Sequence, residues 1–426
     1  MAEGQKEIKA KERGVFEWMF SGDGTLWIII AFLAVASLLV VYSSTASMAY
    51  RVAGGDTSHY MIAQLRVLVL GFIIMVAVHR LNYQGYMRFV QAAFVAALVF
   101  MLMTFFVGVN LNSAARWIRI PIIGMTFQPS DFLRVTLVAL LAQQLAKRQT
   151  VIDKIPIMPA LTPGKWMRNP RKNMDILTKT AIPILGPIAV ACGVIFVSNF
   201  STAAITFFTC FVMLYIGRVR ARELWRLIMV IVVVMTFVVL VMFTFGVGRA
   251  ETWINRVKDF AGIENTQGVA DKDDNLQREQ AEIAIASGGL IGKGPGNSTQ
   301  RSNLPHSYSD FAYAFIVEEY GFIGAVAILF LYLCIFFRGI VTFQRCGTAL
   351  PSFLVLGLCL MITMQALVNM MVSVGIFPVT GQTLPLISLG GSSIIFTSLA
   401  LGIVLGISRQ MKEQSLDKPR GESLLE

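Results

Sequence analysis

The chain consists of long apolar runs separated by short polar segments. An apolar run of about 18 residues is long enough to cross a bilayer as a helix. Two runs, 181–197 and 202–217, are shorter, and we expect these to be tilted or paired as a helical hairpin. In total we predict ten membrane-spanning helices, with approximate bounds 25–43, 61–79, 89–108, 128–146, 181–197, 202–217, 225–247, 311–337, 351–375 and 391–408.

The composition supports a membrane protein. Hydrophobic residues make up 55% of the 426 positions and charged residues 14%, which is too apolar for an ordinary soluble domain. We therefore predict an all-α, polytopic integral membrane protein with one membrane domain, residues 25–408, between tails at 1–24 and 409–426. The first run is long enough to span and lacks the plan of a cleaved signal, so we interpret it as a permanent anchor.

The basic residues indicate the topology, because short cytoplasmic loops retain Lys and Arg. Both tails and alternate loops, including 147–180 and 218–226, are rich in them, whereas the short intervening loops hold Arg51, Arg116 and Arg119. Both termini are therefore predicted to be cytoplasmic. The net charge of +11 suits anionic lipid headgroups and gives no indication of nucleic-acid binding.

Two long loops interrupt the pattern. Loop 147–180 contains four prolines among its basic residues and is interpreted as a headgroup-bound anchor. Loop 248–310 is predicted to be the one large extracytoplasmic loop, and a loop of that length is usually functional or disordered. Within it, 277–286 is compatible with a short helix. The glycine-rich segment SGGLIGKGPGNS at 287–298 then favours tight turns whose N–H groups could face an anion.

Three acids mark the end of that loop and the run that follows it. Asp310 lies at the outer mouth of run 311–337, and Glu318 and Glu319 lie inside the run. An acid in the middle of a membrane helix costs roughly 2.5–3.5 kcal/mol, so such residues are functional candidates. Asp310 is either a general base or a helix cap worth ~1 kcal/mol. Glu318 and Glu319 point to different faces, so one is expected to orient a cavity and the other to bond a neighbouring helix.

Cations suited to an anionic substrate lie on the outer side or inside a span: Arg116, Arg134, Lys293 and Arg301. For Arg116 and Arg301 the alternative is snorkelling to lipid headgroups.

The start of run 128–146 is also polar. Asp131 and Arg134 either line a substrate cavity or form an i,i+3 ion pair that only stabilises the helix. Gln128 and Ser130 can donate hydrogen bonds to a sugar or a diphosphate, although Ser130 could instead cap the helix.

Several blocks of the chain resemble the SEDS (shape, elongation, division and sporulation) family, the FtsW, RodA and SpoVE type of cell-wall polymerase. The resemblance covers about residues 25–408. The blocks are VVYSSTAS at 40–47, NSAARWI at 112–118, QPSDFLR at 128–134, SGGLIGKGPGNS at 287–298, LPHSYSDFAYAFIVEEYG at 304–321 and PVTGQTLPLISLGGSS at 378–393.

The resemblance implies an inverting glycosyltransferase that polymerises lipid II into peptidoglycan glycan at the outer face of the bacterial inner membrane. It also implies a class B penicillin-binding transpeptidase and division proteins as partners. Asp310 matches the family's catalytic aspartate in a block similar to LPEAHTDF, although residues 306–309 differ. Asn297, in the GNS ending that resembles the division branch, joins the candidate substrate-binding residues.

Two other blocks depart from the family pattern. A QPSE block followed by Lys is replaced by Asp131 and Arg134, which keep the sign of the charge, and Arg allows bidentate contacts. Asn199 replaces the acid of a QPDLGT-like run. No cofactor is required by the sequence, and the histidines have no metal-site spacing, but Mg²⁺ or Mn²⁺ could bridge a diphosphate and acids.

Three alternatives to a division polymerase stay open. A flippase for the same lipid would also need polar groups inside spans, such as Asp131 and Arg134. A RodA-type polymerase of cell elongation would share the chemistry. A scaffold would chiefly hold a transpeptidase.

Overall fold

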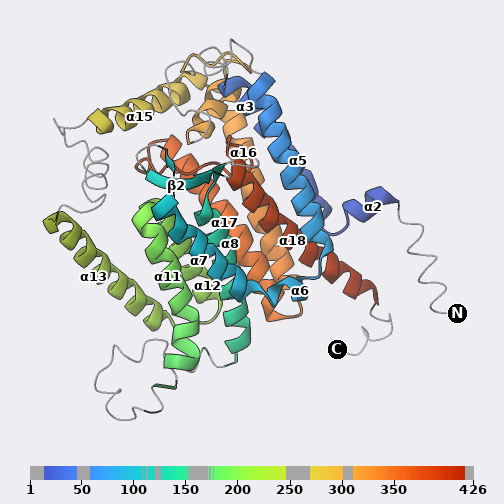
Figure 1. Cartoon of the computed structure of the whole chain (residues 1–426). Helices are drawn as coiled ribbons and strands as arrows, with labels where there is room; N and C mark the ends of the chain where they lie inside the picture. The colour runs from blue at the N-terminus through green and yellow to red at the C-terminus, as the bar shows by residue number, and fades with distance from the viewer. Residues whose placement is uncertain are drawn as a thin grey trace.

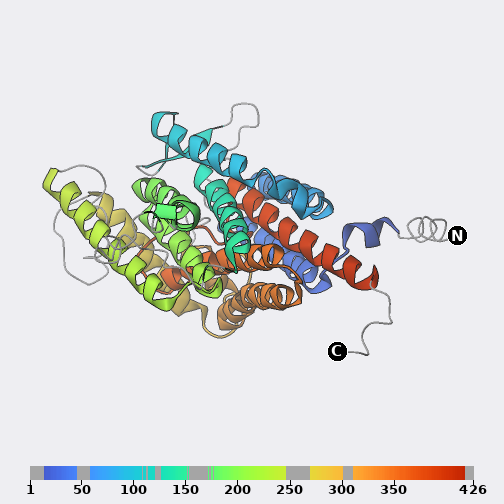
Figure 2. The ribbon, with the colours of Figure 1, turned by 90° about the horizontal axis from the view of Figure 1, so that it is seen from below.

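The computed structural model describes residues 14–45, 58–107, 109–111, 114–119, 126–150, 152, 171, 174–175, 177–245, 269–300 and 310–417. Helices dominate, and most of them form one bundle (Figures 1 and 2). The helices are α2 (Val15–Met19), α3 (Gly24–Ser44), α5 (Ser58–Arg80), α6 (Tyr83–Met87), α7 (Val90–Val107), α8 (Pro129–Arg148), the π-helix η2 (Leu177–Ala181), α11 (Ile182–Ser198), α12 (Phe200–Ile216), α13 (Ala221–Phe245), α15 (Val269–Gly288), α16 (Ala312–Arg345), α17 (Ala349–Ser373) and α18 (Gly391–Asp417).

Each of the ten predicted runs coincides with one helix: α3, α5, α7, α8, α11, α12, α13, α16, α17 and α18. Within the described residues, six helices are long and apolar enough to cross a membrane, counting η2 and α11 as one. The prediction of a polytopic helical membrane protein is thereby confirmed. The two short runs form α11 and α12, which contact each other and are joined by Asn199 alone, so the predicted hairpin is confirmed.

Helix α17 lies at the centre of the bundle. In its most apolar stretch of 18 residues, 83% are buried, against 17% in the corresponding stretch of α5 at the periphery. It contacts α8, α12, α16 and α18. Helix α13 lies at the edge of the bundle (Figures 1 and 2). Polar side chains on α17 can therefore reach several helices, and they organise the site described below.

A small antiparallel sheet was not predicted and adds to the expected all-α fold. Strand β2 (Ala114–Arg119) pairs with β1 (Val109–Leu111) on one side and β3 (Thr126–Phe127) on the other. Strand β3 leads directly into α8, and the Phe127 ring contacts Phe100 and Phe396. These strands are too short for an alternating pattern to be recognised in the sequence.

Helix α16 is broken at Gly321, whose φ of 68° is accessible mainly to glycine. A regular helix would bond N–H 322 to C=O 318 and N–H 323 to C=O 319. Here Phe322 N and Ile323 N donate instead to the carbonyls of Gly289 and Leu290, at 2.9 and 3.3 Å. The freed carbonyls accept from the backbone of the same glycine-rich loop.

The two carbonyls freed by the break accept hydrogen bonds from the loop backbone: Lys293 N donates to Glu318 O (2.9 Å), and Gly294 N donates to Glu319 O (3.0 Å). The loop after α15 is thus inserted into the break and satisfies four backbone groups that the kink would otherwise leave unpaired. The expectation that these loop N–H groups face an anion is wrong for Lys293 and Gly294. The predicted helix at 277–286 is confirmed within the longer α15, which ends at Gly288.

Charged residues tie the opposite end of the bundle together. Arg338, near the end of α16, pairs with Asp23 at the start of α3, with Nη2 and Oδ2 2.7 Å apart. Arg409 on α18 donates from Nε to the carbonyl of His79 on α5. These contacts place the starts of α3 and the ends of α5, α16 and α18 on one side, with α15 on the other (Figure 1).

Replacing Gly321 tests the insertion. We expect Gly321→Ala to lower stability by at least ~1–3 kcal/mol, because a left-handed backbone is strained for alanine and the new Cβ would lie 2.4 Å from Gly292 N and Leu290 O. The measurement is the midpoint of thermal unfolding in detergent. The matched control is Gly193→Ala in α11, where a Cβ meets nothing within 4 Å. An unchanged midpoint for Gly321→Ala would contradict the inserted geometry.

Candidate functional site

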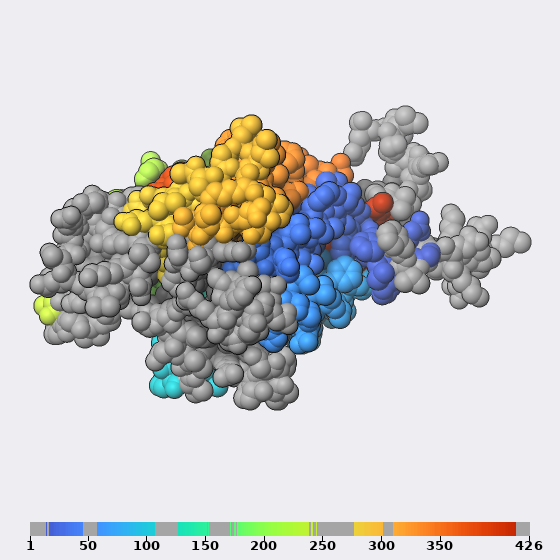
Figure 3. Space-filling model, turned by 90° about the horizontal axis from the view of Figure 1, so that it is seen from above, coloured from blue at the N-terminus to red at the C-terminus, as the bar shows by residue number. Residues whose placement is uncertain are grey.

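Asp310 lies immediately outside the start of α16. The N-cap position is Phe311, so the alternative in which Asp310 itself is the N-cap residue is wrong. The Phe311 side chain is buried in a small apolar cluster with Ala281 and Ala284 of α15, Ala314 and Val372. Helix α15 and the loop after it lie in the middle of this face of the molecule, seen from above in Figure 3. The apolar anchor therefore fixes the turn that carries the half-buried Asp310.

A second attachment of this turn is polar. Asn369, buried on α17, donates from Nδ2 to the carbonyl of Asp310 (2.8 Å) and to the carbonyl of Gln382 (2.7 Å). Gln382 in turn donates from Nε2 to Thr202 Oγ1 on α12 (2.6 Å). The Asp310 turn is thus connected to the segment 378–390 and, through it, to the block 197–202.

Within that block, Asn199 has a structural role. Its Oδ1 accepts from Ser201 N (3.1 Å) and Thr202 N (3.4 Å), which caps α12. An amide performs this capping without a charge. Asn199 therefore needs no negative charge for this role, although it stands where the family pattern has an acid.

Arg134 is the largest buried polar side chain of the site, at 2% exposure. Its Nη1 donates to Gln365 Oε1 on α17 (2.9 Å) and lies 3.7 Å from Asp131 Oδ1. The i,i+3 ion pair therefore exists. Nε and Nη2 have no hydrogen-bond partner within the described part of the chain. A buried guanidinium with donors left over is suited to a further anionic or polar partner.

Helix α17 brings Arg134 and Asp310 to the same region. Gln365 and Asn369 are four residues apart, which is about 6 Å of rise, or one turn. Gln365 also donates to the carbonyl of Thr383 (2.9 Å), so both α17 side chains hold the segment 378–390. The structure thus brings together the predicted base and the predicted buried cation around one helix.

The polar start of α8 decides whether Ser130 caps the helix. The helix begins at Pro129, a favoured first residue, and its N-cap is Gln128. Ser130 is therefore already helical, and the alternative in which it caps the helix is wrong. Gln128 Nε2 donates to Ser130 Oγ at 3.0 Å, so the two residues form a local polar pair beside Asp131.

Glu318 binds the glycine-rich loop. Its Oε1 accepts from Lys293 Nζ (2.7 Å), Thr299 Oγ1 (2.8 Å) and Thr299 N (3.0 Å), and Ser298 Oγ donates to Oε2. The side chain is fully buried. Both oxygens are engaged by protein donors, so the observed contacts make Glu318 a residue that orders the loop, in contrast to the expected substrate contact.

Glu319 binds another helix, as one of the two acids was expected to do. Ser43 Oγ of α3 donates to its Oε1.

Two predicted substrate-binding residues lie in the glycine-rich loop itself. Lys293 donates from Nζ to Thr299 Oγ1 at 2.7 Å, in addition to its bond with Glu318. Asn297 is exposed and donates from Nδ2 to the Lys293 carbonyl at 3.1 Å, which stabilises the loop. The observed contacts of these residues are structural, and their predicted substrate contacts stay predictions.

Two predicted cations cannot be placed in the site. Arg116 lies in β2, but its side chain is outside the described part, and Arg301 lies outside the described residues altogether. Among the described residues, no group of three or more His, Cys, Asp and Glu could hold a metal ion. The site therefore consists of Asp310 and its backbone supports, with the buried Arg134 one turn along α17.

Sequence reasoning missed Gln365, Asn369 and Gln382. The first two were detectable in principle, since they are polar residues four apart inside the apolar run 351–375. Polar residues at such positions commonly face the interior of a bundle. Gln382 lies in a block that was recognised but was given no role.

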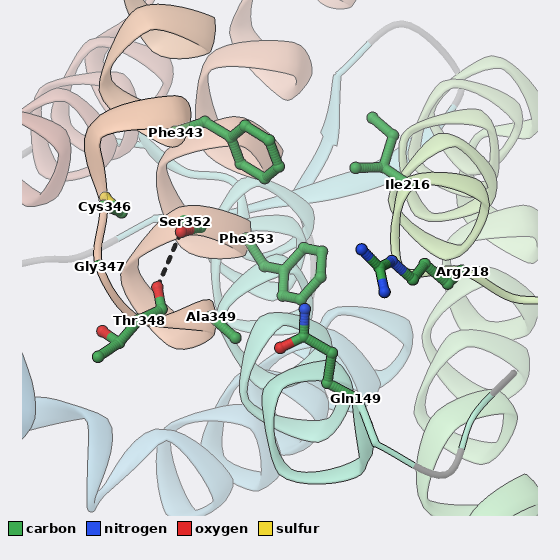
Figure 4. Close-up of a pocket in the computed structure, with 10 residues that line it drawn as sticks. All are labelled: Gln149, Ile216, Arg218, Phe343, Cys346, Gly347, Thr348, Ala349, Ser352 and Phe353. Carbon is green, nitrogen blue, oxygen red and sulfur yellow. Dashed lines mark hydrogen bonds between the residues drawn. The ribbon is translucent and has the colours of Figure 1, made fainter. Parts of the chain in front are cut away.

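A separate cavity of about 360 Å³ lies at the other end of α16 and α17 (Figure 4). It is lined by the end of α16, the start of α17 and residues near the ends of α8 and α12. Among the described residues that line it, Arg218 alone is charged, and the Ser352 hydroxyl donates to the Thr348 carbonyl (2.8 Å). Phe353 at this cavity and Asn369 at the Asp310 turn are 16 residues apart along α17, a rise of about 24 Å. The cavity is not part of the Asp310 site.

Together, the helical bundle and its buried polar centre define a polytopic membrane protein whose candidate site lies at the end of the bundle where α15 packs against α16. The FtsW/RodA/SpoVE family model, described as "Cell cycle protein", matches residues 24–413. The chain therefore belongs to this family, and the resemblance inferred from the motifs is confirmed.

Curated relatives cover nearly the whole chain. A probable peptidoglycan glycosyltransferase FtsW of Bacillus subtilis is 28% identical over 408 residues, which is 95% of this chain and 94% of the relative. Stage V sporulation protein E of the same organism is 28% identical over 395 residues, or 91% of this chain and 97% of the relative.

Solved structures share the fold. A chain from a peptidoglycan synthase complex, described as coordinating polymerization and crosslinking, superposes with a TM-score of 0.66 at 22% identity and covers 92% of this chain and 98% of that one. The rod shape determining protein RodA of Thermus thermophilus gives a TM-score of 0.58 at 22% identity, with 91% and 97% covered.

Glu318 offers a test of the loop's attachment. We expect Glu318→Gln to increase amide hydrogen exchange in residues 289–299 by about tenfold or more, because hydrogen bonds to a charged group contribute ~1.5–3 kcal/mol each and the amide cannot replace them all. The measurement is exchange followed by mass spectrometry.

The matched control is Glu282→Gln on α15, an exposed acid paired with Arg278 that contributes only a few tenths of a kcal/mol, about 0.3–0.5. Equal exchange in the two variants would show that Glu318 does not hold the loop.

Proposed function

We propose that this protein polymerises peptidoglycan glycan strands from lipid II, with Asp310 as the general base. The observation that carries the proposal is the placement of Asp310 on a turn fixed by Phe311 and Asn369, with the buried Arg134 contacting α17 one turn away. Membership of the FtsW/RodA/SpoVE family and relatives named as peptidoglycan glycosyltransferases support it.

The reaction is a single displacement. The 4-hydroxyl of an incoming lipid-linked disaccharide attacks the anomeric carbon of the growing glycan, and a new C–O bond forms as the bond to the polyprenyl diphosphate breaks. The hydroxyl proton passes to the Asp310 carboxylate, and the diphosphate leaves with the electron pair. One in-line step inverts the anomeric configuration.

Arg134 suits the departing diphosphate. Its Nε and Nη2, which have no partner among the described residues, can donate charge-assisted hydrogen bonds, and these strengthen as negative charge develops on the leaving group. Gln365 holds the guanidinium from the other side. Arg116, Lys293 and Arg301 remain candidates for further contacts with the diphosphate or the sugars, as do Gln128, Ser130 and Asn297.

The proposed mechanism does not depend on a metal. Asp131 is paired with Arg134, and Glu318 and Glu319 are bonded to the loop and to α3. Among the described residues, these contacts leave no pair of carboxylates converging beside Asp310, so the site does not fit a protein-built Mg²⁺ or Mn²⁺ site. An ion held mainly by the diphosphate stays a proposal.

The proposed topology has ten spans with both termini in the cytoplasm. Supporting it, the ends of α5, α16 and α18 gather with their basic residues Arg80, Arg338 and Arg409 on the side opposite α15. Asp310 then faces the periplasm, where the large loop 248–310 lies. The membrane is the bacterial inner membrane.

The proposed partner is a class B penicillin-binding transpeptidase of the division machinery. Its support is the fold shared with a chain from a peptidoglycan synthase complex that coordinates polymerization and crosslinking. The GNS ending at 296–298 and the relatives named FtsW favour division over elongation.

Removing the base tests the proposal. We expect Asp310→Asn to reduce glycan polymerisation by ~10²–10⁴-fold, because an amide cannot accept the hydroxyl proton. The assay uses purified protein, with and without a candidate transpeptidase, and fluorescent lipid II. Glu282→Gln, an exposed acid on the same side, should polymerise at the wild-type rate. Full polymerisation by a folded Asp310→Asn protein would remove Asp310 from the role.

The same preparation separates the second candidate, a lipid II flippase. The buried polar contacts of Arg134 and Asp131 are the observation that favours it, since translocation paths need polar groups within spans. Lipid II that crosses the bilayer of liposomes without forming polymer would establish the flippase. Activity that depends on partner contacts and never on Asp310 would indicate a scaffold.

A further inference from the structure

Asn369 holds the main chain of the proposed base. The Asp310 carbonyl and the Gln382 carbonyl both lie within hydrogen-bond distance of Asn369 Nδ2, at 2.8 and 2.7 Å. Carbonyl oxygens only accept hydrogen bonds, so both amide protons are used and the orientation of the side chain is determined. The residue is 1% exposed, and its Oδ1 has no partner among the described residues.

The contact joins three parts of the chain that are distant in sequence. Asp310 precedes α16, Asn369 lies near the end of α17, and Gln382 lies in the segment between α17 and α18. Gln382 continues the connection to Thr202 at the start of α12. Asn369 is itself held in its helix, where Ser373 Oγ donates to its carbonyl at 3.0 Å.

The cost of a misplaced base is large. A displacement of about 1 Å of a catalytic group can reduce a rate by ~10²-fold. The apolar anchor at Phe311 fixes the depth of the turn, but an apolar contact is not directional. The two hydrogen bonds from Asn369 add the direction: one binds the Asp310 carbonyl, and the other binds the Gln382 carbonyl and so fixes the orientation of the amide that holds Asp310.

We propose that Asn369 is a positioning residue for Asp310: its amide group fixes the Asp310 main chain against the segment 378–390, so that the carboxylate is held where the acceptor hydroxyl binds. The role rests on the proposed polymerase function and adds to it a residue that itself makes no contact with the reacting atoms.

Asn369→Asp tests the role with a side chain of the same shape. An ionised carboxylate would direct acceptors at both carbonyl oxygens, and a protonated carboxyl has only one proton to donate, so at least one of the two bonds is lost. We expect kcat for lipid II polymerisation to fall by about 10²-fold, with KM for lipid II nearly unchanged, since substrate contacts are retained. A peptide covering 310–320 should also exchange its amide hydrogens faster.

The matched control is Thr363→Val. Thr363 is equally buried on α17, six residues and about 9 Å of rise before Asn369. It donates to the carbonyl of Tyr332 on α16 (3.3 Å), so it joins α17 to α16 without contacting the Asp310 turn. This variant should keep the wild-type kcat and the wild-type exchange in 310–320.

Three results would overturn the proposal: an unchanged kcat in Asn369→Asp, a fall in kcat matched by the control, or a fall in kcat with unchanged exchange in 310–320. The exchange measurement is independent of polymerisation. If wild-type protein made no polymer, the polymerase function would fail, while exchange would still decide whether Asn369 fixes the Asp310 turn.

Discussion

The glycine-rich loop and the break in α16 depend on each other. The break at Gly321 would leave two carbonyls and two N–H groups of a membrane helix without partners, and the backbone of residues 289–294 supplies all four. The loop, in turn, is glycine-rich and has few side chains of its own. Its position is fixed by these backbone bonds and by the hydrogen bonds that the Glu318 carboxylate accepts from Lys293 and Thr299. The first half of α16, with Asp310 just before its start, therefore takes its direction from this insertion.

Polar contacts on α17 then relate that half-helix to the rest of the site. Gln365 holds Arg134 and Asn369 holds the Asp310 turn, one helical turn apart on the most buried helix of the bundle. Hydrogen bonds in so dry an environment are strong, and leaving one of their members unpaired is costly. The same contacts that stabilise the bundle thus also define the separation of the two groups on which the proposed chemistry depends.

The helices were predictable from the sequence because a membrane span needs a long apolar run, and each run coincides with a helix. Asp310 and Arg134 were predictable as candidates, because charged residues in or beside such runs are exceptional. The insertion of the glycine-rich loop into α16 was not predictable from the sequence, since Gly321 resembles any other glycine inside an apolar run. Its pairing with residues 289–294 is a long-range backbone contact without periodicity. The contact of Arg134 with Gln365, 231 positions away, likewise leaves no local pattern.

The break in α16 also means that a change of angle at Gly321 displaces the far end of the first half of the helix. Gly321 lies eleven positions after Asp310, a length of about 16 Å at 1.5 Å per residue. A tilt of about 5° at the glycine therefore displaces the far end by about 1.4 Å, which is enough to disturb a catalytic contact. The four backbone bonds between the glycine-rich loop and the break therefore set the position of a carboxylate that lies a whole half-helix away from them.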